Sequence, residues 1–124
     1  MADLRITSMA HDLMAHAQAR QEVVARNMAN ADTPGYRAAD LPSFAETLET
    51  GAGLKATRAG HIGWEPGRRD AEPVERAAEA SPNGNTVSLE TEMMKAAEIR
   101  QSHDMALSIY TTVSQIRSTA LGRK

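Results

Sequence analysis

The sequence predicts a mainly α-helical protein in which long N- and C-terminal helices pack as an antiparallel, coiled-coil-like pair. Two observations support the helices: apolar residues recur every three or four positions from Ile6 to Asn30, and again from Leu89 to Leu121. A third observation concerns residues 49–86, which hold six of the eight glycines and three of the five prolines. We therefore expect two ordered ends and a flexible middle, an arrangement in which only the helices offer a core.

The N-terminal helix is predicted by an apolar stripe on one of its faces. Spacings of three and four place the stripe along a single side, as in an amphipathic helix that packs against a partner. The stripe consists of Ile6, Met9, Ala10, Leu13, Ala17, Val24, Met28 and Ala31. Within it, we expect Leu13, Val24 and Met28 to make helix-packing contacts.

The end of this helix carries two asparagines one turn apart, followed by Thr-Pro-Gly-Tyr. Asparagine is a mediocre helix former whose side chain competes for backbone hydrogen bonds, so the pair is typical of a helix end or of a contact with another chain. The four residues after it predict a type II turn with a positive φ at glycine. The simplest interpretation is a helix stop; the alternative is an assembly motif. That motif would comprise Asn27, Asn30, Thr33, Pro34, Gly35 and Tyr36.

A short helix is predicted between Leu41 and Leu48, opened by a proline and a serine. Phe44 and Leu48 are four residues apart and would share one face of it. We take residues 1–48 and 87–124 as one helical domain, joined by the segment 49–86.

The central segment has few large apolar residues to offset the entropy of ordering it. We expect it to be flexible, or to form a short β-hairpin near residues 62–64, Ile-Gly-Trp. A marginal helical turn is expected from Glu72 to Glu79.

The C-terminal helix is predicted to begin after an N-cap at Ser88 and to stop at Gly122. Its apolar residues form two adjoining rows, which give it more apolar breadth than one partner helix can cover. One row contains Leu89, Met93, Ala96, His103, Leu107 and Tyr110, and the other contains Ile99, Ala106, Val113, Ile116 and Ala120. We expect one row to meet the N-terminal helix and the other to meet a neighbouring subunit.

Composition argues against several functional classes. The net charge is −2 with both signs mixed, and no long basic run indicates nucleic-acid binding. There is no cysteine, no stretch apolar enough to span a bilayer and no apolar core of a secretory signal. The four aromatic residues suit only a thin core, so we expect association to complete it.

Catalytic chemistry is equally weakly indicated. His11 and His16 are five residues apart on different helix faces, and His103 with Asp104 and Glu98 is more typical of a polar patch in an apolar row. No phosphate-binding loop or nucleophile motif is present. We expect no enzyme activity, no cofactor, no metal and no small-molecule substrate.

Two segments resemble the FlgB family of flagellar basal body rod proteins, within the rod and hook group of axial proteins. Residues 25–36 read Ala-Arg-Asn-Met-Ala-Asn-Ala-Asp-Thr-Pro-Gly-Tyr, which is similar to the N-terminal signature of that group. Residues 84–93 read Gly-Asn-Thr-Val-Ser-Leu-Glu-Thr-Glu-Met and resemble the family's opening of the C-terminal helix. The family more often has aspartate where this chain has Ser88, and both residues are good N-caps. The resemblance covers roughly residues 6–48 and 83–121.

The resemblance implies a structural subunit of the proximal rod that polymerises through its terminal helices and helps to transmit torque. It implies a periplasmic location reached by flagellar type III export without a cleaved signal peptide. The implied partners are other rod subunits, the basal-body adaptor protein and the export gate, which Phe44 and Leu48 would contact through a short recognition motif. A soluble helical-hairpin adaptor or chaperone-like module is the alternative hypothesis, and the other short proximal rod protein is a sister assignment.

Overall fold

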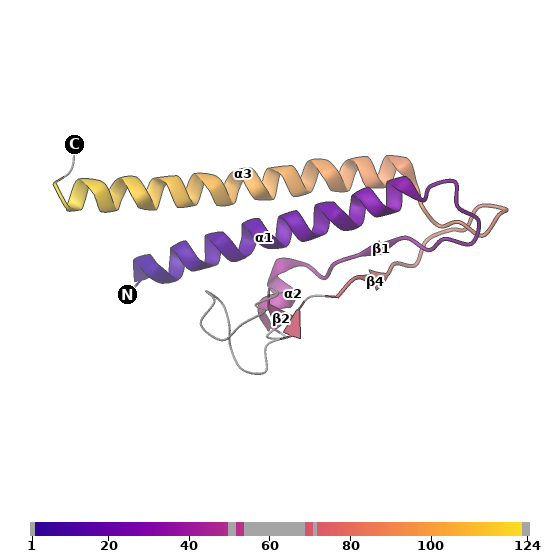
Figure 1. Ribbon diagram of the computed structural model, residues 1–124, viewed down its shortest axis with the longest axis horizontal. Helices are drawn as coiled ribbons and strands as arrows, with labels where there is room; N and C mark the ends of the chain where they lie inside the picture. Colours follow the sequence, from indigo (N-terminus) through magenta and orange to yellow (C-terminus); the bar gives the residue numbers. More distant parts are fainter. Residues whose placement is uncertain (1, 50–51, 54–68, 71, 123–124) are drawn as a thin grey trace.

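The computed structural model describes residues 2–49, 52–53, 69–70 and 72–122. Figure 1 shows two long helices side by side, with the N- and C-termini at the same end of the pair. The prediction of a mainly helical fold with an antiparallel pair is therefore confirmed. The elements are α1 (Ala2–Ala29), β1 (Ala39–Asp40), α2 (Phe44–Glu49), β2 (Ala52–Gly53), β3 (Arg69–Asp70), β4 (Val74–Glu75) and α3 (Leu89–Ala120).

The helices α1 and α3 meet along a narrow row of mostly small side chains. On α1 the buried residues Ala10, Ala17 and Val24 are seven apart, and on α3 Ile99 and Ala106 have the same spacing. Ala17, Val24 and Ile99 contact one another as the core of the pair. A repeat of seven is the spacing of coiled coils, in which the same face of each helix stays toward its partner.

The ends of α3 follow the predicted signals. Ser88 is the N-cap, and its hydroxyl accepts a hydrogen bond from the Thr91 N–H. Gly122 has a φ of 71° and stops the helix, because this left-handed conformation is one that glycine adopts without strain. The N-terminal helix begins at Ala2, before the predicted start at Ile6, and ends at Ala29.

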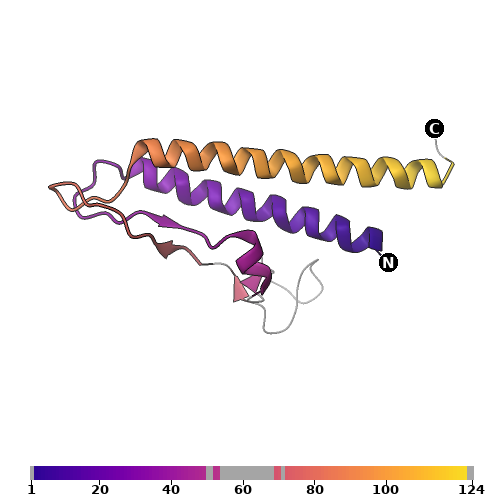
Figure 2. The ribbon, with the colours of Figure 1, turned by 180° about the vertical axis from the view of Figure 1, so that it is seen from behind.

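The described part of the middle of the chain consists of short elements, of which β1 contacts α1 and β2 contacts α2. Strands β1 and β4 pair antiparallel, with Ala39 opposite Glu75, and β2 and β3 pair parallel. The rear view in Figure 2 shows β1, β4 and α2 beside α1, on the side away from α3. The short helix α2 overlaps the stretch Leu41–Leu48 that was predicted to be helical and ends one residue beyond it, at Glu49.

The helical turn expected from Glu72 to Glu79 is wrong. This stretch is extended and contains β4, and the Arg76 N–H donates to the Ala38 carbonyl at 3.0 Å. Pairing with β1 satisfies backbone groups that a single helical turn would leave without partners. The hairpin expected near residues 62–64 lies outside the described residues.

Candidate assembly site

Asn27 lies at the centre of the contacts that join α1, β1 and α3. Its side chain is fully buried, and its amide group donates to the Ala39 carbonyl at 2.7 Å and to a Glu92 carboxylate oxygen at 3.2 Å. Its oxygen accepts from the Ala39 N–H and from the Tyr36 hydroxyl, both at 3.2 Å. All the hydrogen-bonding capacity of the side chain is therefore used within the chain. This explains why an asparagine stands inside the last turn of a helix.

A set of charged side chains continues from Asn27 across the three elements. Glu92 is 1% exposed and lies 3.5 Å from the Lys95 ammonium, which is 3.6 Å from Asp40. Asp40 also binds Arg20 through two parallel hydrogen bonds of 2.9 and 3.0 Å. We call Arg20, Asn27, Asp40, Glu92 and Lys95 the polar cluster. It pairs each buried carboxylate with a cation, as burial of charge requires.

The pairing sets the ionisation of Asp40. Burial of the carboxylate acts to raise its pKa, but the hydrogen bonds and charge of Arg20, the charge of Lys95 and the Leu41 N–H together lower it below its ordinary value. The hydrogen bond to Asp40 correspondingly raises the pKa of Arg20. Both groups are therefore charged at neutral pH, and β1 is held to α1 by an ion pair.

The second half of the assembly motif contacts the segment that leads into α3. We call this contact between Gly35 and the residues Asn83 and Gly84 the junction. Gly35 has a φ of 74°, and the Tyr36 N–H donates to the Thr33 carbonyl, which confirms the turn with positive φ at glycine. The Gly35 N–H donates to the Asn83 carbonyl at 3.0 Å. A second left-handed glycine, Gly84, stands against it, since a Cβ built there would lie 3.4 Å from the Gly35 Cα.

Asn85 caps the carboxyl end of α1 from across the junction. Its buried amide group donates to the carbonyls of Asn30, Ala31 and Thr33 at 2.8–2.9 Å. These carbonyls lie at and beyond the helix end, where no further turn supplies an N–H. Asn30, in contrast, bonds locally to the Arg26 carbonyl at 2.8 Å. The sequence alone predicts no role for Asn85, although its place two residues after Asn83 and beside Gly84 is a turn signal.

The two residues of the candidate export motif lie on α2, which is opened by a reciprocal cap. The Ser43 hydroxyl accepts from the Glu46 N–H, and the Glu46 carboxylate accepts from the Ser43 N–H. Phe44 is half-buried and its ring meets His16 edge-on at 5.7 Å, while Leu48 is 42% exposed. His16 in turn bonds the Pro42 carbonyl at 2.8 Å.

The residues predicted to pack the helices have three different environments. Val24 and Ile99 are buried between α1 and α3, and Leu13, Tyr110 and Val113 are half-buried there or at its edge. The remaining ones are exposed on the single chain: Met28, Leu89, Met93, Leu107 and Ile116. Three further exposed apolar residues of α3 were not in either predicted row, namely Met94, Met105 and Ile109.

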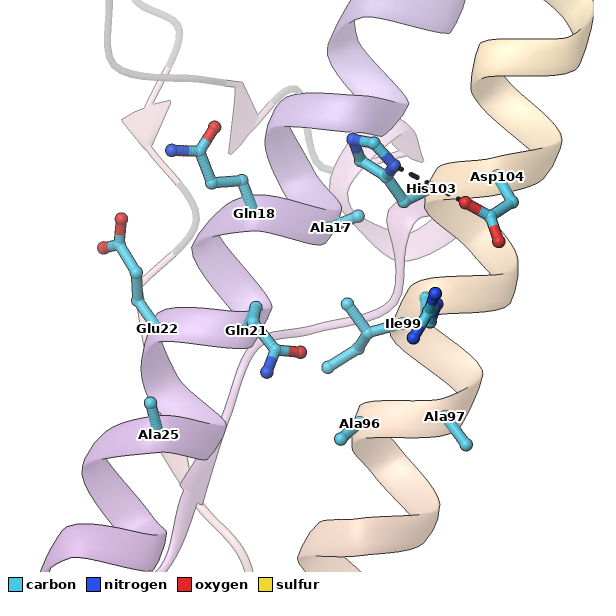
Figure 3. Close-up of a pocket in the computed structure, with 11 residues that line it drawn as sticks. Ala17, Gln18, Gln21, Glu22, Ala25, Ala96, Ala97, Ile99, His103 and Asp104 are labelled. Atoms are coloured by element: carbon cyan, nitrogen blue, oxygen red, sulfur yellow. Dashed lines mark ion pairs between the residues drawn. The ribbon is translucent and has the colours of Figure 1, made fainter.

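A groove runs between α1 and α3 on the face away from β1 and α2. It has a volume of about 880 Å³. Figure 3 shows Ala17 and Ala96 facing it from opposite helices and Ile99 at its floor. His103 stands exposed at its edge, 3.9 Å from Asp104. Among the described residues no group of three potential metal ligands comes together, and no helix in that part of the chain is apolar enough over sufficient length to cross a membrane.

Known proteins are similar in sequence to this chain over most of its length. A family model described as "Flagella basal body rod protein" matches residues 14–37. The chain is 35% identical to the flagellar basal body rod protein FlgB of Agrobacterium fabrum, over 73% of this chain and 72% of the relative. It is 40% identical to FlgB of Proteus mirabilis, over 64% of this chain and 66% of the relative. It is 32% identical to FlgB of Salmonella typhimurium, over 87% of this chain and 84% of the relative.

The match to Salmonella FlgB covers 87% of this chain and so reaches both long helices, and the family model covers α1 from Met14 together with the turn that ends at Tyr36. These similarities favour the structural hypothesis over that of a soluble adaptor. They also agree with the expectation of no enzyme activity, because the family is structural and non-enzymatic. The chain belongs to the FlgB family of flagellar basal body rod proteins.

Proposed function

We propose that this chain is a proximal rod subunit that polymerises through its terminal helices and helps to transmit torque along the rod. The observation that carries the proposal is the apolar surface of α3. Met94, Met105, Leu107 and Ile116 are each between 47% and 67% exposed. Four large apolar side chains exposed along one helix are typical of a surface that association buries.

The energetics favour association over this surface. Full burial of a Leu, Ile or Met side chain stabilises by roughly 1.5–3 kcal/mol relative to leaving it in water. The core of the single chain is thin, since its buried apolar residues in the helix pair are mostly alanine and valine. Contacts with other subunits therefore supply stabilisation that the chain lacks alone.

The polar cluster suits a subunit that bears load. It joins β1 to α1 through the two hydrogen bonds between Arg20 and Asp40, and to α3 through the ion pair between Lys95 and Asp40. Hydrogen bonds between charged groups are stronger than neutral ones. A torque applied to one helix is then transferred to the other and to the segment between them. In this proposal the subunit lies in the periplasmic rod and contacts other rod subunits and the basal-body adaptor protein.

We also propose that Phe44 and Leu48 contact the export gate before assembly. Leu48 is exposed on α2, so its replacement removes a recognition side chain at little cost to folding. A Leu48→Ala variant should be retained inside the cell several-fold more than a Glu49→Ala variant, which changes the neighbouring exposed residue. Fractionation of cells with an antibody to the chain measures this, and equal secretion of the two variants would remove the export role.

The assembly proposal is tested with a charge on the exposed part of α3. Ile116→Asp would bury an unpaired carboxylate in an interface at a cost of several kcal/mol, whereas the isolated chain leaves this position in water. We expect the variant to keep its helical circular dichroism but to abolish motility in a strain lacking the native gene. Thr91→Asp, which adds the same charge near the start of α3, is the control. If both strains swim equally well, this part of α3 is not an interface.

A further inference from the structure

Near the start of α3, the α1–α3 pair has one face occupied by β1 and one open face. β1 is held to Arg20 and Lys95 by ion pairs, so one side of the pair is occupied by the chain itself. The groove lies on the other side, where Ala17, Ala25, Ala96 and Ala97 replace the long side chains that would otherwise fill it. Small residues on both walls allow a third helix to approach closely, with Ile99 as an apolar floor.

The chain also carries a surface suited to enter such a groove. From Met105 to Ile116 the sequence has no charged residue, although most of this stretch is exposed. Met105, Ile109 and Ile116 are spaced by four and seven and share one face of α3. We call this face the ridge. A ridge without charges loses little hydration energy when it is buried.

The length of its uncharged stretch, residues 105–116, distinguishes the ridge from the other exposed helix surfaces that the structure describes. The outer side of α1 bears Glu22 and Arg26, and the first half of α3 bears Glu98, Arg100 and Asp104. The walls of the groove themselves carry charges of both signs at Glu22, Arg100 and Asp104. Because the ridge carries no charge of its own, it can lie between these walls without meeting a like charge on either of them.

We propose that the groove between α1 and α3 receives the ridge of a second copy of this chain. Groove and ridge lie on different sides of α3, so one copy offers both at once. The contact is therefore heterologous, and each added copy leaves a free groove and a free ridge for the next, which generates an open polymer. The inference rests on the proposed function and adds to it the two surfaces that meet.

The positions of the groove and the ridge along α3 also determine how far two neighbouring copies are shifted relative to each other. The α3 side of the groove is centred near residue 100, and the ridge is centred near residue 110. At 1.5 Å per residue, copies that run parallel are displaced by about 15 Å along α3. Each contact thus joins two copies that are shifted relative to each other along the axis of α3.

Cross-linking tests the contact, because the chain has no cysteine of its own. Ala97→Cys marks the groove, Ile109→Cys marks the ridge, and Glu79→Cys marks an exposed segment outside both. Pairs of single-cysteine versions with different tags are expressed in a strain lacking the native gene, and a short bis-maleimide is added. We expect at least tenfold more mixed dimer from the groove–ridge pair than from the groove–Glu79 pair. Each single variant alone should give no more dimer than Glu79→Cys.

A groove-filling variant provides a second readout. Ala97→Trp should lower incorporation into purified basal bodies at least tenfold with unchanged helical circular dichroism, while Thr91→Trp retains incorporation. Cross-links between two groove cysteines, cross-links only to a different rod protein, or normal incorporation of Ala97→Trp would each overturn the inference. If the native chain is found in basal bodies and supports swimming but no groove–ridge product forms, the inference alone fails. If the native chain is absent from basal bodies, the proposed function fails.

Discussion

Single residues decide how the end of α1 is tied to the rest of the molecule. Asn27 and Gly35 were identified from the sequence because their chemistry is local: one is a poor helix former inside a helix, and the other follows proline in a turn. Asn85 and Glu92 were not assigned to this site, because their partners are distant in the chain. Glu92 bonds Asn27 from 65 residues away, and nothing in the spacing of Glu90 and Glu92 shows which of the two faces inward.

Replacing Asn27 with alanine should destabilise the isolated chain by about 2–4 kcal/mol. The change leaves the buried Glu92 carboxylate with one fewer donor and the Ala39 backbone groups without their side-chain partner. Urea unfolding followed by circular dichroism measures the difference. Asn30→Ala is the matched control and should cost about 1 kcal/mol or less, since the two local bonds that it removes, to the Arg26 carbonyl and from the Thr33 hydroxyl, are both exposed. Equal losses would mean that Asn27 acts only as a helix stop.

At the scale of elements, the limits of the helices were predictable and the faces they bury were less so. Caps and stops depend on neighbouring residues, and Ser88 and Gly122 hold the predicted places. The buried face of α1 follows Ala10, Ala17 and Val24, whereas Ile6, Met9 and Met28 from the same predicted stripe are exposed. A stripe chosen for large apolar residues misses this, because close approach of two helices selects small ones.

The docking of β1 should depend on pH through Asp40. Its pKa in the folded chain is lowered from an unfolded value of about 3.9. The stabilisation is therefore fully present above about pH 4 and is lost as the pH falls through the folded-state pKa. Asp40→Asn should lower the free energy of unfolding by about 2 kcal/mol at pH 7.

Thermal unfolding at several pH values tests this dependence on Asp40. The difference between Asp40→Asn and the native chain should shrink as the pH is lowered below 4, and Asp32→Asn, at an exposed position, should show no such trend. A difference that is constant down to pH 2 would mean that the ion pair with Arg20 does not hold β1.

At the scale of the whole molecule, order along the helix pair is expected to be greatest where α1 and α3 are joined and to fall toward the C-terminal end of α3. The buried residues of α3 are Glu92, Ile99 and Ala106, and beyond Ala106 no described residue of α3 is fully buried. Composition predicted a thin core, but only the three-dimensional arrangement shows that it lies in the part of the pair next to the junction.

Amide exchange on the purified chain should reflect this gradient. Amides of residues 92–106 should exchange at least tenfold more slowly than those of residues 111–120, because local opening is easiest where few apolar contacts are lost. The amides of Arg76 and Thr86 should also be protected, since both donate to backbone carbonyls of the segment after α1. In purified basal bodies the protection of residues 111–120 should rise. Uniform protection of α3 in the isolated chain would contradict the gradient.

The hydrogen bonds that join Asn27 and the end of α1 to Asn85 and Glu92 also bear on when the chain can fold. They link positions more than 50 residues apart, and contacts of large sequence separation form late in folding. While a chain emerges N-terminus first from a ribosome or a narrow channel, the residues of α1 are available, but the residues of α3 that they contact are not. The chain therefore stays unfolded until α3 has emerged. The helix that completes the fold is also the one whose exposed apolar side chains are proposed to contact another subunit.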